Sequence, residues 1–109
     1  MLEAIVGNAT IEKILLFFER YGTGYPKQIA DTFDIPVNGI QQQIKRLENG
    51  GVIVSRLYGK VRLYEFNPRY PFIKELRALL KKAFIYMPPE VVKQYYMERT
   101  RPRRPGKPL

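Results

Sequence analysis

Apolar residues recur at helical spacing in the first part of the chain. The first set follows the i, i+3, i+4, i+7 pattern of a helix packed on a core: Ile11, Ile14, Leu15 and Phe18. Asn8 or Thr10 can cap this helix by accepting a hydrogen bond from a free backbone N–H, and Gly22 can end it. A second helix is expected over Pro26–Phe33, because proline is tolerated in a first turn.

The segment Pro36–Asn49 combines an apolar stripe with a polar face. The stripe consists of Val37, Ile40, Ile44 and Leu47. The polar side carries amide and cationic residues, with Gln41 at its border: Asn38, Gln41, Gln42, Lys45 and Arg46. Such side chains can read base edges in a major groove while the apolar stripe anchors the helix to a core. An ordinary amphipathic surface helix shows the same pattern, so this helix alone leaves the function open.

A β-hairpin is predicted directly after this third helix. Gly50-Gly51 can end the helix, and Val52–Tyr58 and Val61–Phe66 are rich in β-branched and aromatic residues. Gly59-Lys60 forms the short turn between them. The tip then carries Arg56, Tyr58, Lys60 and Arg62, with no acid among them.

The rest of the chain predicts one or two further helices and a basic end. A fourth helix is expected to open at Pro71, with an apolar stripe wider than packing on one small domain requires: Phe72, Ile73, Leu76, Leu79, Leu80 and Ala83. This stripe and that of the first helix, which Leu16 and Phe17 widen, predict a homodimer. Residues 90–99 could form one more short helix that docks through Val91, Val92, Tyr95 and Tyr96.

Residues 99–109 hold five bases, three prolines and no acid, including Arg101, Arg103 and Arg104. That composition is typical of an extended arm, which is either solvated or lies on DNA phosphates. We therefore divide the 109 residues into a domain over 1–84 and a C-terminal extension over 85–109, which comprises a short helix and a basic, proline-rich tail.

Composition narrows the possible functions. Cysteine and histidine are both absent, which removes Cys-His and Ser-His-Asp nucleophile systems and zinc sites built from those ligands. The acids are scattered, and no phosphate-binding glycine motif occurs. No apolar run is long enough to span a membrane, and no signal peptide is recognisable. We expect a cytoplasmic, non-enzymatic protein without a metal or other cofactor.

Charge is distributed unevenly along the chain. Residues 1–34 carry three bases and five acids, a net charge of −2, whereas residues 35–109 carry sixteen bases and five acids, a net charge of +11. The basic part begins where the third helix begins. Such one-sided charge raises the local concentration of a polyanion such as DNA.

The segment QIADTFDIPVNGIQQQIKRLENGGVI resembles ArsR- and MarR-like regulators of the winged helix-turn-helix superfamily. The shared features are an Ile/Leu-Ala pair, an apolar turn residue, a Leu-Glu-x-x-Gly helix end and a β-branched strand start. Here they are Ile29-Ala30, Ile35, Leu47-Glu48 with Gly51, and Val52-Ile53. The resemblance covers roughly residues 10–84 and implies a mainly α fold with a three-helix core, a two-stranded wing and additional C-terminal helices. ArsR-type metal sensing is not expected, because thiol and imidazole ligands are missing.

The resemblance implies sequence-specific binding to double-stranded DNA by a transcriptional regulator. The third helix would place Asn38, Gln42 and Arg46 at base edges and Lys45 on phosphate. Arg56, Lys60 and Arg62 of the wing would flank it on the backbone or in the minor groove. An alternative remains open: residues 63–82 also look like winged-helix domains found beside nucleotidyltransferase domains in toxin–antitoxin-type systems, which implies a module that binds a protein or an RNA.

Overall fold

The computed structural model describes residues 1–97 of the chain. Its helices are α1 (Glu3–Val6), α2 (Ala9–Tyr21), α3 (Pro26–Phe33), α4 (Val37–Asn49), α5 (Ile73–Tyr86) and α6 (Pro89–Tyr95). Its strands are β1 (Thr23–Gly24), β2 (Ile53–Tyr58) and β3 (Val61–Phe66). The predicted mainly α fold with a three-helix core, a two-stranded wing and C-terminal helices is confirmed.

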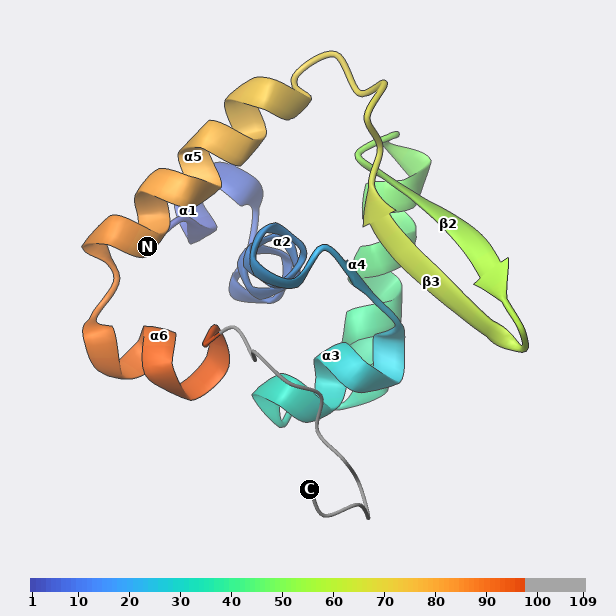
Figure 1. Ribbon diagram of the computed structural model, residues 1–109, viewed down its shortest axis with the longest axis horizontal. Helices are drawn as coiled ribbons and strands as arrows, with labels where there is room; N and C mark the ends of the chain where they lie inside the picture. Colours follow the sequence, from blue (N-terminus) through green and yellow to red (C-terminus); the bar gives the residue numbers. More distant parts are fainter. Residues whose placement is uncertain (98–109) are drawn as a thin grey trace.

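Helix α2 forms the centre of the molecule, with α3, α4, α5 and α6 arranged around it (Figure 1). Its apolar residues are wholly buried on two sides: Ile11, Ile14, Leu15, Leu16, Phe17 and Phe18. Asn8 begins the helix, because its Oδ1 accepts a hydrogen bond of 2.8 Å from the N–H of Ile11. Since the chain's own helices cover the wide stripe of α2, this stripe no longer supports a homodimer.

Helices α3 and α4 form the helix-turn-helix unit. Ile29, Ala30 and Phe33 of α3 are buried in the same core as the apolar stripe of α4. The turn between them reverses the chain at Asp34, which takes a left-handed conformation with φ 57°. The N–H of Ile35 then donates to the carbonyl oxygen of Ala30 at 3.0 Å, and the Ile35 side chain packs against the core.

The wing belongs to a three-stranded antiparallel sheet of order β1-β3-β2. The sequence pattern did not indicate β1, in which Thr23 pairs with Glu65 and Gly24 with Tyr64. Gly24 is required there, because a Cβ at this position would lie 2.5 Å from Cε1 of Phe17. The strand β1 therefore ties the root of the hairpin to the end of α2.

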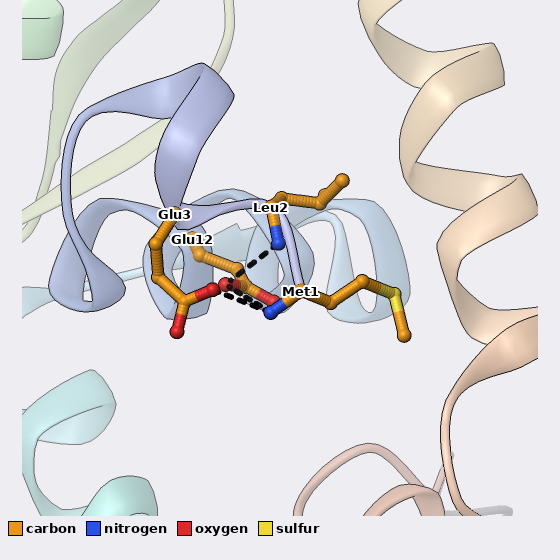
Figure 2. Close-up of polar contacts among 4 residues, drawn as sticks. All are labelled: Met1, Leu2, Glu3 and Glu12. Atoms are coloured by element: carbon orange, nitrogen blue, oxygen red, sulfur yellow. Dashed lines mark hydrogen bonds and ion pairs between the residues drawn. The ribbon is translucent and has the colours of Figure 1, made fainter.

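The first residues of the chain also form structure that the pattern did not indicate. Leu2 is buried, and its N–H donates to Oε1 of Glu12 at 3.2 Å. The amino group of Met1 pairs with Glu3 and lies 3.6 Å from Oε1 of Glu12 (Figure 2). These contacts hold α1 against α2.

The C-terminal helices close the side of the core that lies away from the hairpin (Figure 1). The predicted short helix is present as α6, and Tyr96 after it is buried between Phe33 and Phe84, with ring centroids 5.6 and 5.1 Å away. The hydroxyl of Tyr21 donates to the carbonyl oxygen of Tyr95 at 2.7 Å. Residues 85–97 thus share the core of residues 1–84, and their division into a separate unit stays a prediction.

Candidate nucleic-acid interface

The exposed face of α4 carries the residues that the sequence analysis proposed as base readers. Asn38, Gln41, Gln42, Lys45 and Arg46 are all exposed, whereas Ile40, Ile44 and Leu47 are buried. At 100° per residue, Asn38, Gln42, Lys45 and Arg46 project away from the core, and Gln41 lies toward one edge. Across α4, all of which the structure describes, no large apolar side chain is exposed.

The two edges of α4 face different parts of the molecule. One edge faces the hairpin, because the Oγ of Ser55 donates to Oε2 of Glu48 at 3.3 Å. The other faces the α1–α2 connection, where Nδ2 of Asn8 donates to Oε1 of Gln43 at 3.4 Å. Arg46 lies toward this second edge, since a Cβ placed on Gly7 would be 3.5 Å from its Nη2. The exposed polar face therefore lies between the hairpin and the α1–α2 connection.

The hairpin register places Arg56 and Arg62 on opposite faces of the wing. Ile53, Ser55 and Leu57 pair with Phe66, Tyr64 and Arg62, and side chains alternate between the two faces along each strand. Arg62 therefore shares a face with Ser55, whose side chain contacts α4. Arg56 lies on the reverse face. Along the sequence both cations fall near one tip, and the pattern does not show that they lie on opposite faces.

Arg56 lies near a carboxylate, and Arg62 is linked to one through a serine. Nη2 of Arg56 is 3.6 Å from Oε1 of Glu65, and Nη1 of Arg62 donates to Oγ of Ser55 at 2.9 Å, which in turn contacts Glu48. Burial raises the pKa of Tyr64, and the negative charge of Glu48 raises it further. Glu48, Ser55 and Arg62 thus form a polar link between α4 and the wing that the sequence did not reveal, because it depends on strand register.

Lys60 is the wing cation whose charge is least engaged by neighbouring side chains. It stands in the exposed two-residue turn and has no ion pair among residues 1–97. Lys45 and Arg46 of α4 likewise have no ion pair in that part of the chain. The remaining predicted site residues, Arg101, Arg103 and Arg104, lie outside the described residues.

Part of the positive charge lies elsewhere. Helix α5 carries Lys74, Arg77, Lys81 and Lys82, and Figure 1 shows this helix on the side of α2 away from the hairpin. Arg77 is paired with Glu19, its Nε lying 2.8 Å from the carboxylate Oε1. The charge asymmetry of the sequence therefore does not map onto a single face of the molecule.

Within residues 1–97 there is no cluster of three or more Asp, Glu, His or Cys side chains that could hold a metal ion. No helix in the same part of the chain is both long and apolar enough to cross a bilayer.

Solved structures with the same arrangement of elements exist, although no protein-family model and no curated protein matches the sequence. A variant of Lactococcus lactis ZitR in its apo form matches over 77% of this chain and 71% of that one, at 19% identity and a TM-score of 0.56. The adhesin competence repressor AdcR of Streptococcus pyogenes matches over 86% and 73%, at 16% identity and a TM-score of 0.57. This chain has the winged helix-turn-helix fold.

A further match concerns DNA directly. Wild-type ZitR in complex with DNA covers 87% of this chain and 67% of its own, at 14% identity and a TM-score of 0.55. These neighbours, one of them named a repressor and one bound to DNA, share the fold of this chain.

The solved structures do not support the expectation that no metal takes part. It rested on the absence of cysteine and histidine from the sequence. One matching structure is described as an apo form, so a protein of this fold has a ligand-bound state as well. The absence of two residue types is therefore no sufficient ground for excluding a metal here.

Proposed function

We propose that this chain is a transcriptional regulator that binds double-stranded DNA in a sequence-specific way. The observation that carries the proposal is the exposed face of α4, which presents amide and cationic groups and no large apolar side chain. A protein-docking face usually presents aromatic or methionine anchors, whereas this set matches the donors and acceptors of base edges. We also propose that the protein acts in the cytoplasm, as expected from the sequence.

In the proposed complex, α4 enters the major groove and the wing lies on the adjacent backbone or minor groove. Asn38, Gln42 and Arg46 contact base edges, while Gln41 lies at the border of the contact and Lys45 binds phosphate. Arginine that donates two parallel hydrogen bonds to guanine O6 and N7 makes the commonest base-specific contact in major grooves. Arg46 can adopt this role by turning from its position beside Gly7 toward the groove.

The cations of the wing contribute unequally to this proposal. Lys60 binds phosphate, since no carboxylate among residues 1–97 competes for it. Arg56 and Arg62 reach DNA only when they leave Glu65 and the Ser55–Glu48 link. The tail residues Arg101, Arg103 and Arg104 add sequence-independent phosphate contacts.

Selection of bound fragments from the host genome with the purified chain tests the proposal. The selected fragments should share a common site. On that site, Arg46→Ala should cost about 1–3 kcal/mol and relax the preference at one base pair. Arg69→Ala is the matched control, because Arg69 is also exposed but lies outside α4 and the wing. Fragments without a shared site, or equal effects of the two substitutions, would contradict the proposal.

We also propose that the chain forms a homodimer, through a smaller apolar surface than the sequence suggested. In α5, Leu80 and Ala83 are buried within the chain, and Phe84 packs on Tyr96. The large apolar side chains that remain exposed at the α5–α6 corner are Ile85, Tyr86 and Met97. Ile85 and Met97 line a cavity of about 510 Å³ together with Met87 and Val92. A two-fold pair would place two α4 helices about 34–36 Å apart on a palindromic site.

The same apolar corner favours the alternative function, a module that holds a different protein. Sedimentation of the purified chain separates the two possibilities. A dimer that Ile85→Ser weakens supports self-association through this corner. A monomer that selects no common DNA site supports the partner-binding module, including the type found beside nucleotidyltransferases.

A further inference from the structure

The tip of the wing is apolar as well as basic. Leu57, Tyr58 and Val61 are 62%, 68% and 40% exposed, although Ile53 at the root of the same hairpin is buried. A single exposed leucine needs no explanation, but three large apolar side chains within five residues of one turn form a concentrated patch. We call this patch, formed by Leu57, Tyr58 and Val61, the apolar tip.

The hairpin presents the apolar tip on a narrow ribbon. Tyr58 and Val61 pair across the two-residue turn, and Leu57 pairs with Arg62 on the opposite face. Gly59 opens the turn with φ 67°, which matches the tight hairpin turn with glycine at its first loop position. Figure 1 shows the ribbon projecting from the helical body, so a partner can enclose the tip from both faces.

Charge indicates which partner fits the apolar tip. Arg56, Lys60 and Arg62 flank it within the same hairpin, and the nearest carboxylates, Glu65 and Glu48, lie toward its root. A partner must therefore offer negative charge on both sides of an apolar floor. A minor groove into which side chains insert has this arrangement, because phosphates line both of its edges, and the sugars and the faces of the unstacked bases offer apolar surface between them. Proteins that bind this groove frequently insert apolar side chains between base steps.

We propose that the tip of the wing, with Leu57 on one face and Tyr58 on the other, acts as an apolar wedge that enters the minor groove beside the α4 site, opens one base step and bends the duplex. The wedge rests on the proposed DNA-binding function, which it extends from recognition to deformation of the site. Pyrimidine–purine steps are the easiest to unstack, so the wedge favours TA or CA/TG steps at a position where the protein makes no hydrogen bond to a base. It thereby adds specificity that α4 does not supply.

The test compares three variants on a genome-selected duplex with a dye at each end. Leu57→Ser combined with Tyr58→Ser should straighten the bound DNA, as measured by energy transfer, and lower affinity about tenfold, the equivalent of about 1.4 kcal/mol. The slope of log K against log salt should not change, because no charge is removed. Lys60→Ala should instead keep the bend in the DNA and make the slope shallower by about 0.9. Phe72→Ser is the matched control, since Phe72 is also 62% exposed but lies outside the hairpin.

The outcomes separate the wedge from the function on which it rests. Wild-type protein that binds a selected duplex without bending it overturns the wedge and leaves the proposed function intact. Wild-type protein that does not bind duplex DNA overturns both. If the double serine variant keeps the bend but loses self-association in sedimentation, or loses binding to anionic phospholipid vesicles, the tip serves another partner and the wedge is wrong.

Discussion

Lys60 and the Arg56–Glu65 pair provide a sharp comparison of two kinds of charge on the wing. Lys60 has no ion pair among residues 1–97, whereas Arg56 lies 3.6 Å from Glu65 with both side chains partly exposed. Lys60→Ala removes one unpaired positive charge. The double substitution Arg56→Gln with Glu65→Gln removes an ion pair and leaves the net charge of the wing unchanged. Neither change disturbs the core, because surface pairs of this kind contribute only about 0–1 kcal/mol to stability.

The expected effects on DNA binding follow from counterion release. Each neutralised phosphate contributes about −0.9 to the slope of log K against log salt. Lys60→Ala should therefore make the slope shallower by about 0.9. With 1 M salt as the reference at which this contact adds nothing to affinity, the substitution lowers affinity for DNA about fivefold at 0.15 M salt. Deleting the Arg56–Glu65 pair should change the slope by much less, because the Glu65 carboxylate already compensates Arg56 in the free protein.

Fluorescence anisotropy of a labelled duplex, titrated at several salt concentrations between about 50 and 200 mM, measures both slopes. Thermal unfolding of each variant verifies that the fold is retained. If the pair deletion lowers the slope as much as Lys60→Ala does, Arg56 contacts phosphate in the complex and the reasoning from its ion pair is wrong. If Lys60→Ala has the same slope as the wild type, the wing lies outside the DNA interface.

Other predictions concern stability and the C-terminal residues. Tyr96→Ala should lower the free energy of unfolding by about 3–5 kcal/mol in urea, because the ring is buried in the core. Burial also raises the pKa of the Tyr96 hydroxyl above its ordinary value of 10.0. The stability that the neutral hydroxyl contributes is therefore complete below pH 10 and is lost as pH rises further. Tyr96→Phe should reduce this loss of stability at alkaline pH. Gly24→Ala should destabilise by about 1–3 kcal/mol through its clash with Phe17, whereas Gly39→Ala, with open space around it in α4, should stabilise by about 0.5–1 kcal/mol. Removing residues 99–109 should weaken binding equally for every DNA sequence and leave the melting temperature nearly unchanged; unchanged affinity or a large drop in melting temperature would contradict this.

Local patterns predicted the helices and the hairpin well. The bounds of α3 and the last residue of α4 agree with the sequence analysis, because proline, glycine and the apolar periodicity act within a few residues. The polar face of α4 followed from the same periodicity. These features are local, so the sequence indicates them directly.

The elements that the sequence analysis missed depend on contacts between distant residues. Helix α1 and strand β1 are too short to carry a periodic pattern, and they form because Glu12 binds the first residues and β3 pairs with Thr23. The partners of Arg56 and Arg62 depend on strand register, which fixes which side chains share a face. A list of cations along the chain therefore overestimates how many are free to bind phosphate.

The central claim is that the exposed face of α4 reads base edges. The most direct test is the ratio of affinities for a genome-selected duplex and a shuffled duplex of the same composition, measured at one physiological salt concentration. The wild-type ratio should reach about 10³ or more, and Asn38→Ala combined with Gln42→Ala should reduce it by about tenfold or more while affinity for the shuffled duplex stays the same. A wild-type ratio near one, or a double variant that keeps the full ratio, would contradict the claim.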